Sequence, residues 1–243
     1  MSSSAEPGEG SGVLPATLSE GLGVLHLFWK LGPMSDRGAV LDAIEKTKAD
    51  GAQVVTVAML GHKADLAVMA LSEDLWLLRR LQTKLTVAGL DLVDSYLSLT
   101  EVSEYAAGVP DEMKQARLYP HLPPEGKQAW CFYPMSKRRE QGQNWFTTDF
   151  DRRKELMYDH GTSGRKFAGR LVQLITASTG VDDYEWGVTL FAERPDDLKD
   201  VVYTMRFDEA SAVFAEFGAF YTGMVANADA VLDEIGLVDG DAT

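Results

Sequence analysis

Hydrophobic and polar positions along the first half of the chain follow the periods of strands and helices in turn. In GVLHLFWKL, Leu25, Leu27 and Trp29 fall on one face, which predicts a strand. A helical period follows Asp36, a residue type suited to capping a helix N-terminus. The predicted elements are strands at 23–31, 53–60 and within 90–105, and helices at 37–49 and 71–87.

The second half shows a similar order of elements after a connector at 106–127, which contains four prolines. Such a long connection is uncommon in a compact domain and is often functional. The elements predicted beyond it are strands at 128–134, 169–177, 183–191 and 213–225, and helices at 149–158, 196–207 and 227–235.

Together these patterns predict an α+β fold with antiparallel sheets and helices packed outside them. The shared order of elements indicates two similar modules, although no residue-by-residue repeat relates them. We expect a disordered lead, a first half, the connector, a second half and an acidic tail, at 1–20, 21–105, 106–127, 128–236 and 237–243.

Composition narrows the classes of function. The chain has 243 residues, 45% of them hydrophobic, which is enough for a substantial core. Cys131 is the single cysteine, which excludes an intrachain disulfide and a multi-cysteine zinc site. A net charge of −14 argues against nucleic acid as a partner. No apolar run is long enough to span a membrane, and the first residues lack signal-peptide features, so we expect a cytoplasmic protein.

His160 and Gln173 stand out in the stretch MYDHGTSGRKFAGRLVQLITAS. The pattern puts His160 at the end of a helix, where a lone histidine is often a plain cap. A single histidine cannot form a zinc site, but it suffices for haem iron, because the porphyrin supplies four ligands. Gln173 falls on an apolar strand face with Leu171 and Ile175. Its amide therefore indicates either a cavity or a hydrogen bond at an edge or subunit interface.

Tyr133 ends a predicted strand and precedes three adjacent cations, Lys137, Arg138 and Arg139. The cations predict either a carboxylate-binding site or a solvated basic loop. Arg206 with Ser211 offers a second anion-binding group, with the same two interpretations.

The other histidines have simpler interpretations. His26 lies within a strand beside core residues, which favours a buried structural role. His62 falls in a polar loop and is expected in solvent. His121 lies among the prolines of the connector, where solvent exposure is favoured over a place at a pocket mouth.

Five motifs together resemble the chlorite dismutase-like superfamily, and within it the coproheme decarboxylases, including those of actinobacterial type. The motifs are FYPMSKRRE, NWF, MYDHGTSGRKFAGRLVQLITAS, DDYEWGVTLFAE and YTMRFDEASAVFAEFGAFYTG, between about residues 129 and 223. This resemblance implies two ferredoxin-like modules forming a dimeric α+β barrel in each subunit, commonly assembled as a homopentamer. It also implies transient contact with the upstream ferrochelatase.

The resemblance implies an oxidoreductase of haem biosynthesis. Its substrate would be iron-coproporphyrin III (coproheme), its product haem b, and its oxidant hydrogen peroxide, with two propionates becoming vinyl groups. His160 would bind the iron, and Tyr133 would be the redox tyrosine. The porphyrin and its propionates would be bound by Lys137, Trp145, Arg206 and Ser211.

Gln173 corresponds to the distal position, where chlorite-degrading members of the family carry arginine. Glutamine therefore disfavours chlorite dismutase or general peroxidase activity, and a non-catalytic haem-binding or haem-transfer protein is a further alternative. The distal base stays open among Gln173, His121 and other residues. A carboxylate such as Glu209 is expected to tune the iron-binding histidine.

Overall fold

A computed structural model describes residues 12–106 and 108–238. Its first module has the order βαββαβ, and its four strands lie side by side as β2-β3-β1-β4, all antiparallel. This is the ferredoxin-like arrangement. The elements are β1 (Gly23–Leu31), α1 (Arg37–Ala49), β2 (Gln53–Met59), β3 (Leu66–Ser72), α2 (Leu75–Val87) and β4 (Leu90–Thr100).

The second module repeats this order, with β8-β9-β5 side by side and both β10 and β11 along the other edge of β5. Its elements are β5 (Ala129–Lys137), α4 (Phe150–Arg165), β8 (Leu171–Ala177), β9 (Trp186–Ala192), α5 (Pro195–Met205), α6 (Glu209–Ala212), β10 (Ala215–Phe217) and β11 (Tyr221–Ala226). Smaller elements are α3 (Asp111–Leu118), the hairpin β6 (Arg139–Glu140) and β7 (Gln143–Asn144), the 3₁₀ turn η1 (Trp145–Thr147) and α7 (Ala228–Glu234).

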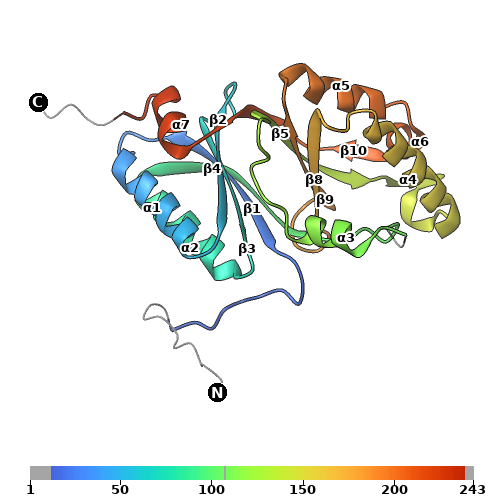
Figure 1. Cartoon of the computed structure of the whole chain (residues 1–243), viewed down its shortest axis with the longest axis horizontal. Helices are drawn as coiled ribbons and strands as arrows, with labels where there is room; N and C mark the ends of the chain where they lie inside the picture. Colours follow the sequence, from blue (N-terminus) through green and yellow to red (C-terminus); the bar gives the residue numbers. More distant parts are fainter. Residues whose placement is uncertain (1–11, 107, 239–243) are drawn as a thin grey trace, which may run out of the picture.

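The two modules join into one closed sheet, because β11 pairs with β2 and β4 pairs with β8. Helices α1, α2 and α7 cover one side of this barrel, and α4, α5 and α6 cover the other (Figure 1). The α+β class, the antiparallel sheet and the outer helices predicted from the sequence are thus confirmed. The residue limits proposed for the two halves remain predictions.

The predicted helix at 71–87 was wrong at its start, because strand β3 ends at Ser72 and the helix begins at Leu75. All seven residues of β3 are buried, so it lacks the alternation that marks a strand with one solvent face. Asp74, whose carboxylate accepts from the Trp76 N–H, caps the helix. The Asp36 cap of α1 is as predicted, since its carboxylate accepts from the Ala39 N–H.

Three further predictions need correction in the second half and the connector. Helix α4 does not stop near Gly161 but continues to Arg165, and the long strand at 213–225 is two strands, β10 and β11, separated by residues 218–220. Glycine lowers helix propensity by only about 1 kcal/mol. Here the buried Leu156 and Phe167 anchor the chain on either side of that glycine. The connector contains the helix α3, which its prolines concealed.

The ends of the chain lie partly outside the described residues, which leaves the predicted lead and tail untested at 1–11 and 239–243. Within the lead, the Ala16 N–H donates to Asp74 Oδ1 at 3.0 Å. Near the tail, the Arg37 guanidinium donates to the carbonyl of the buried Leu237 at 2.6 Å. No helix among the described residues has both the length and the apolar character needed to cross a bilayer.

Candidate functional site

Tyr133 and Gln173 lie on the same face of the second-module sheet. Tyr133 pairs with Val188, and Val188 pairs with Ile175; one row further along, Leu190 pairs with Gln173. Directly paired residues in antiparallel strands point to the same side. This face carries the cluster that packs against α5, so both polar side chains point towards the helix layer of the second module, in which α4 contacts α5. They are separated by two strand spacings, roughly 10 Å across the sheet, and by two residues along the strand direction.

Tyr133 sits in an aromatic enclosure. Its ring stacks on Phe220 with centroids 4.4 Å apart and meets the edge of Phe217 at 5.5 Å. The side chain is 6% exposed, and burial raises the pKa of the phenol well above its usual value. The hydroxyl makes no hydrogen bond to any described residue. Tyr133 is therefore a neutral phenol with an unshared O–H.

His160 lies within α4 rather than at its end, so the interpretation of this histidine as a C-terminal cap is wrong. His160 lies one helical turn after Leu156 and one before Gly164. Leu156 packs in the cluster that includes Ala210 of α6, and Gly164 lies beside Met205 of α5. The His160 Nδ1 lies 3.0 Å from Oδ2 of Asp208, a carboxylate that is almost fully buried. This contact leaves Nε2 available to a ligand.

Lys137 is a buried cation at the end of β5. Its Nζ donates to the Ala210 carbonyl at 2.6 Å and lies 4.4 Å from the centroid of the Trp145 ring. Burial lowers the pKa of the ammonium to about 8, although the negative charges of Asp208 and Glu185 act in the opposite direction and raise it. The described residues offer it no ion pair, so a carboxylate entering the site would find a cation without a partner.

Arg206 and Ser211 flank Asp208 in sequence but face different surroundings. The exposed guanidinium of Arg206 lies 4.4 Å from the centroid of Phe217, the ring that borders Tyr133. Ser211 is 8% exposed, and its N–H donates to Asp208 Oδ1 at 3.0 Å. The fold therefore gathers His160, Lys137, Trp145 and Ser211 around α6, and it brings Arg206 to the enclosure of Tyr133.

Gln173 is half-buried, and its side-chain amide has no hydrogen bond to a described residue. Ile175, two residues along on the same face, is 43% exposed although it is apolar. A free amide beside an exposed apolar side chain fits a ligand that would cover both.

Two residues of this region had no signal in the sequence. Asp208 supplies the carboxylate beside His160, whereas the expected Glu209 points elsewhere and pairs with Arg152 at 2.7 Å. Tyr105, the residue before the connector, stacks on Phe150 at 5.8 Å, and burial raises the pKa of its hydroxyl to about 12. Both positions depend on segments distant in the chain, so neither follows from local pattern.

The remaining histidines are not joined to this site by any contact between described residues. His26 lies inside the barrel, where its Nε2 is 2.9 Å from Thr189 Oγ1 and burial lowers its pKa to about 3. His62 and His121 are exposed. The residues flanking His121 are tied to the first module, because the Gln53 amide bonds to both Pro120 and Leu122.

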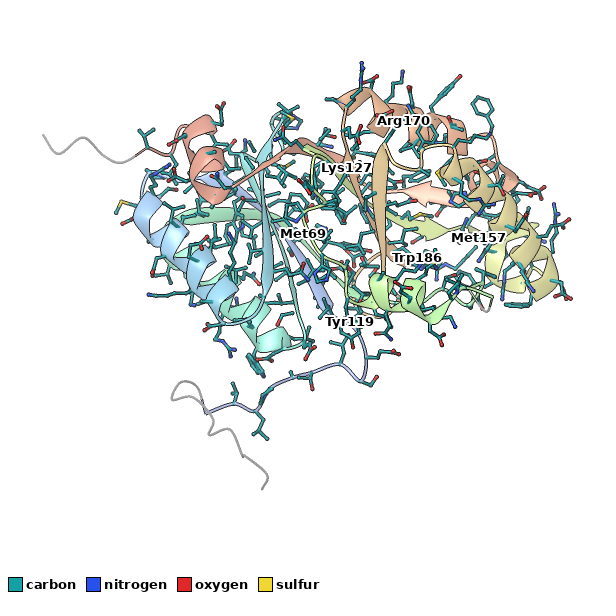
Figure 2. All side chains as sticks on the ribbon, in the orientation of Figure 1. Met69, Tyr119, Lys127, Met157, Arg170 and Trp186 are labelled. Atoms are coloured by element: carbon teal, nitrogen blue, oxygen red, sulfur yellow. The ribbon has the colours of Figure 1, made fainter. Side chains whose placement is uncertain are left out.

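Cavities elsewhere do not compete with this site. A cavity of about 430 Å³ lies beside α3, and it includes none of the residues predicted to be functional. Half of its polar lining residues are acidic, namely Glu20, Glu104 and Asp111. Figure 2 shows Met157 on α4 and Trp186 at the start of β9, both on the second-module side of the barrel.

The donor set fits an iron porphyrin better than a bare metal ion. No group of three or more His, Cys, Asp or Glu side chains suited to a metal ion occurs among residues 12–106 and 108–238. His160 offers one imidazole nitrogen, with the other nitrogen held by a carboxylate, as is usual for histidines that bind metals. One such ligand suffices for haem iron, and Lys137, Arg206 and Ser211 suit its carboxylate substituents.

Comparison with known proteins identifies the class. The chlorite dismutase family model matches residues 36–226, which include the first module except β1, the whole second module and every candidate site residue. The chain belongs to the chlorite dismutase family.

Relatives within this family resemble the chain closely. Over 175 residues it is 46% identical to a coproheme decarboxylase of Staphylococcus carnosus, covering 68% of this chain and 70% of that protein. It is 39% identical, over 86% of its length, to a Natronomonas pharaonis protein provisionally named as haem-binding, and it spans only 40% of that relative. A haem-binding protein of Thermus thermophilus has the same fold, with a TM-score of 0.79 and 33% identity, covering 92% of this chain and 99% of that one.

Proposed function

We propose that the protein is a coproheme decarboxylase that uses hydrogen peroxide to convert two propionates of iron-coproporphyrin III to vinyl groups, giving haem b. The observation that carries this proposal is the placement of Tyr133 and Gln173 on the sheet face that packs against α5, the helix that α4 with His160 contacts. Identity of 46% to a coproheme decarboxylase supports it.

Substrate binding would use both the imidazole and the cations. His160 Nε2 would bind the iron, while Asp208 fixes the ring through Nδ1. Lys137, Arg206 and Ser211 would bind carboxylates, and Trp145 would form an apolar wall. The ammonium of Lys137 is already desolvated, so a carboxylate there would meet a charge little screened by water.

The chemistry requires an oxidant. Each propionate, with one hydrogen peroxide and one proton, gives a vinyl group, carbon dioxide and two water molecules. The β-carbon loses a hydrogen, the carboxyl carbon leaves as carbon dioxide, and peroxide takes up the two electrons. The substrate's own iron would supply the reaction with peroxide when bound.

Tyr133 suits hydrogen transfer between that oxidising centre and the propionate. Because burial keeps the phenol protonated, its O–H can be lost and regained as a hydrogen atom instead of being ionised beforehand. The stacked Phe220 and the edge of Phe217 exclude water from the ring, which protects a radical from side reactions.

Gln173 favours this activity over chlorite decomposition. A neutral amide can orient peroxide by hydrogen bonds, but it lacks the fixed charge with which arginine would hold an anionic oxidant. His121 is exposed and tied to the first module, which leaves Gln173 as the better candidate on the distal side.

The proposal also includes the assembly of the protein, for which family resemblance is the only support. We expect a homopentamer in the cytoplasm that meets the upstream ferrochelatase transiently. Sedimentation of the purified protein tests the pentamer, and a monomer at micromolar concentration would contradict it.

The deciding experiment is to mix the protein with coproheme, add hydrogen peroxide in steps, and follow the porphyrin by mass spectrometry. We expect two successive losses of a carboxyl group, ending at haem b. Binding without any mass change would indicate a haem carrier instead, and oxygen release on adding chlorite would indicate a chlorite dismutase.

A further inference from the structure

The short helix α6 contacts both the histidine and the lysine of the candidate site. Asp208, its N-cap, accepts a hydrogen bond from the Ser211 N–H at 3.0 Å, and the same carboxylate holds His160 Nδ1. Two residues on, the Ala210 carbonyl accepts from Lys137 Nζ at 2.6 Å. A chain of hydrogen bonds and one helical turn therefore joins Lys137 to His160.

This helical turn is built to move as one piece. Its backbone closes on itself, with the Ala212 N–H donating to the Asp208 carbonyl at 2.7 Å and the Val213 N–H to the Glu209 carbonyl at 3.1 Å. Ala210 is fully buried in a cluster with Trp145 and Phe214. Packed interiors shift as units instead of deforming locally, so a displacement at Ala210 would also displace Asp208.

Lys137 is the group on which an incoming carboxylate would act. An ammonium has three donors, of which one is used by Ala210, and the described residues supply no anion for the others. A carboxylate that draws the ammonium towards itself must either pull Ala210 along or break that bond. Either result changes the position of α6.

We propose that α6 couples carboxylate binding at Lys137 to the hydrogen bond that holds His160. The inference rests on the proposed function and extends it. The site would distinguish two kinds of porphyrin by the strength with which His160 binds the iron. One kind presents a carboxylate to Lys137, and the other presents an uncharged ester or vinyl group. In the first, Asp208 shifts relative to Nδ1 and the donor strength of Nε2 changes.

Thermodynamic linkage makes this coupling measurable. If a carboxylate at Lys137 changes the affinity of the iron for a ligand opposite His160, that ligand changes the affinity for the carboxylate by the same factor. Cyanide is a suitable probe of the opposite position, because its binding is read from the Soret band without turnover.

The test compares ferric complexes of coproheme and of its tetramethyl ester, which lacks ionised carboxylates. In the native protein we expect the cyanide dissociation constants to differ by about fivefold or more, the lower range of coupling between sites. Lys137→Gln should bring the two constants within about twofold of each other, because the coupling free energy is then lost. Arg206→Gln is the matched control: it removes another candidate carboxylate ligand that lies against Phe217 instead of α6, so it should weaken coproheme binding but preserve the difference.

Asp208→Asn provides a second route if Lys137→Gln fails to fold, because asparagine also caps helices well. It should abolish the difference between the two porphyrins and shift the iron–histidine Raman frequency of the ferrous complex. Equal cyanide constants in a native protein that still decarboxylates coproheme would overturn the coupling alone. Failure of the protein to bind either porphyrin would overturn both the coupling and the proposed function.

Discussion

Tyr133 stacks on Phe220 with ring centroids 4.4 Å and planes 23° apart, and the first module holds this pair in place. Lys63, in the loop between β2 and β3, donates to the Phe220 carbonyl at 2.6 Å. The backbone of the residue whose ring covers the candidate redox tyrosine is therefore tied to the other module. Closure of the barrel thus positions a side chain of the site as well as forming the core.

Tyr133→Phe should stop decarboxylation while leaving porphyrin binding intact, because only the O–H is lost. We expect the rate of the first carboxyl loss to fall by about 100-fold or more, the scale at which a positioned transfer group contributes. Stopped-flow spectra and product masses measure this. Tyr203→Phe, an exposed tyrosine on α5, is the control and should change nothing. A normal rate in Tyr133→Phe would reject the radical role.

His160→Ala should remove the iron ligand from the protein. The Soret spectrum of the coproheme complex should change, and added imidazole should restore it in part, because the cavity left by the side chain can admit that ligand. His62→Ala alters an exposed histidine and should leave the spectrum as it was. If both variants give the native spectrum, iron is bound by some other group.

Coproporphyrin binding should weaken at alkaline pH, because Lys137 loses its positive charge. Burial lowers the pKa of this ammonium to about 8, so the charged form that attracts carboxylates predominates below pH 8 and is lost above it. Affinity should fall by up to about tenfold for each pH unit above that value if the charge is essential. Bound carboxylate favours the charged form, so the complex itself should lose its proton at higher pH.

Fluorescence titration of metal-free coproporphyrin would measure the pH dependence of its affinity without iron. The titrations should cover about 1.5 pH units on either side of the pKa of Lys137. Lys137→Gln should bind more weakly throughout and lose the dependence near pH 8. An identical pH profile in the variant would assign the dependence to another group.

Gly218→Ala should destabilise the segment 218–220, which joins β10 to β11 between Phe217 and Tyr221 and contains Phe220. A Cβ there would lie 2.6 Å from Pro134 Cγ and 2.8 Å from the Tyr184 ring, closer than packed atoms allow. Overpacking of this kind costs about 1–3 kcal/mol in the free energy of unfolding, measured with urea. Gly108→Ala meets open space and serves as the control. Equal stability of the two variants would mean that the segment between β10 and β11 relaxes freely.

Much of the site could be anticipated from the sequence, but the contacts of its residues could not. Motifs pointed to Tyr133, His160, Gln173 and Lys137. Period-2 alternation correctly put Gln173 and Ile175 on one face. The sequence could not reveal Asp208 as the partner of His160, because 48 residues separate them and Glu209 beside it is an equally good carboxylate. Only the packing of α6 against α4 distinguishes the two.

The sequence by itself determined the α+β class, the limits of β1 and α1, and the residue types available for binding a porphyrin. These follow from local periodicity and capping, which act over a few residues. Tertiary structure decided that β3 is a strand, that α4 continues past Gly161, and that the two modules close one barrel. These outcomes depend on burial and on pairing between distant segments, whose free energy outweighs the local preferences that a sequence pattern records.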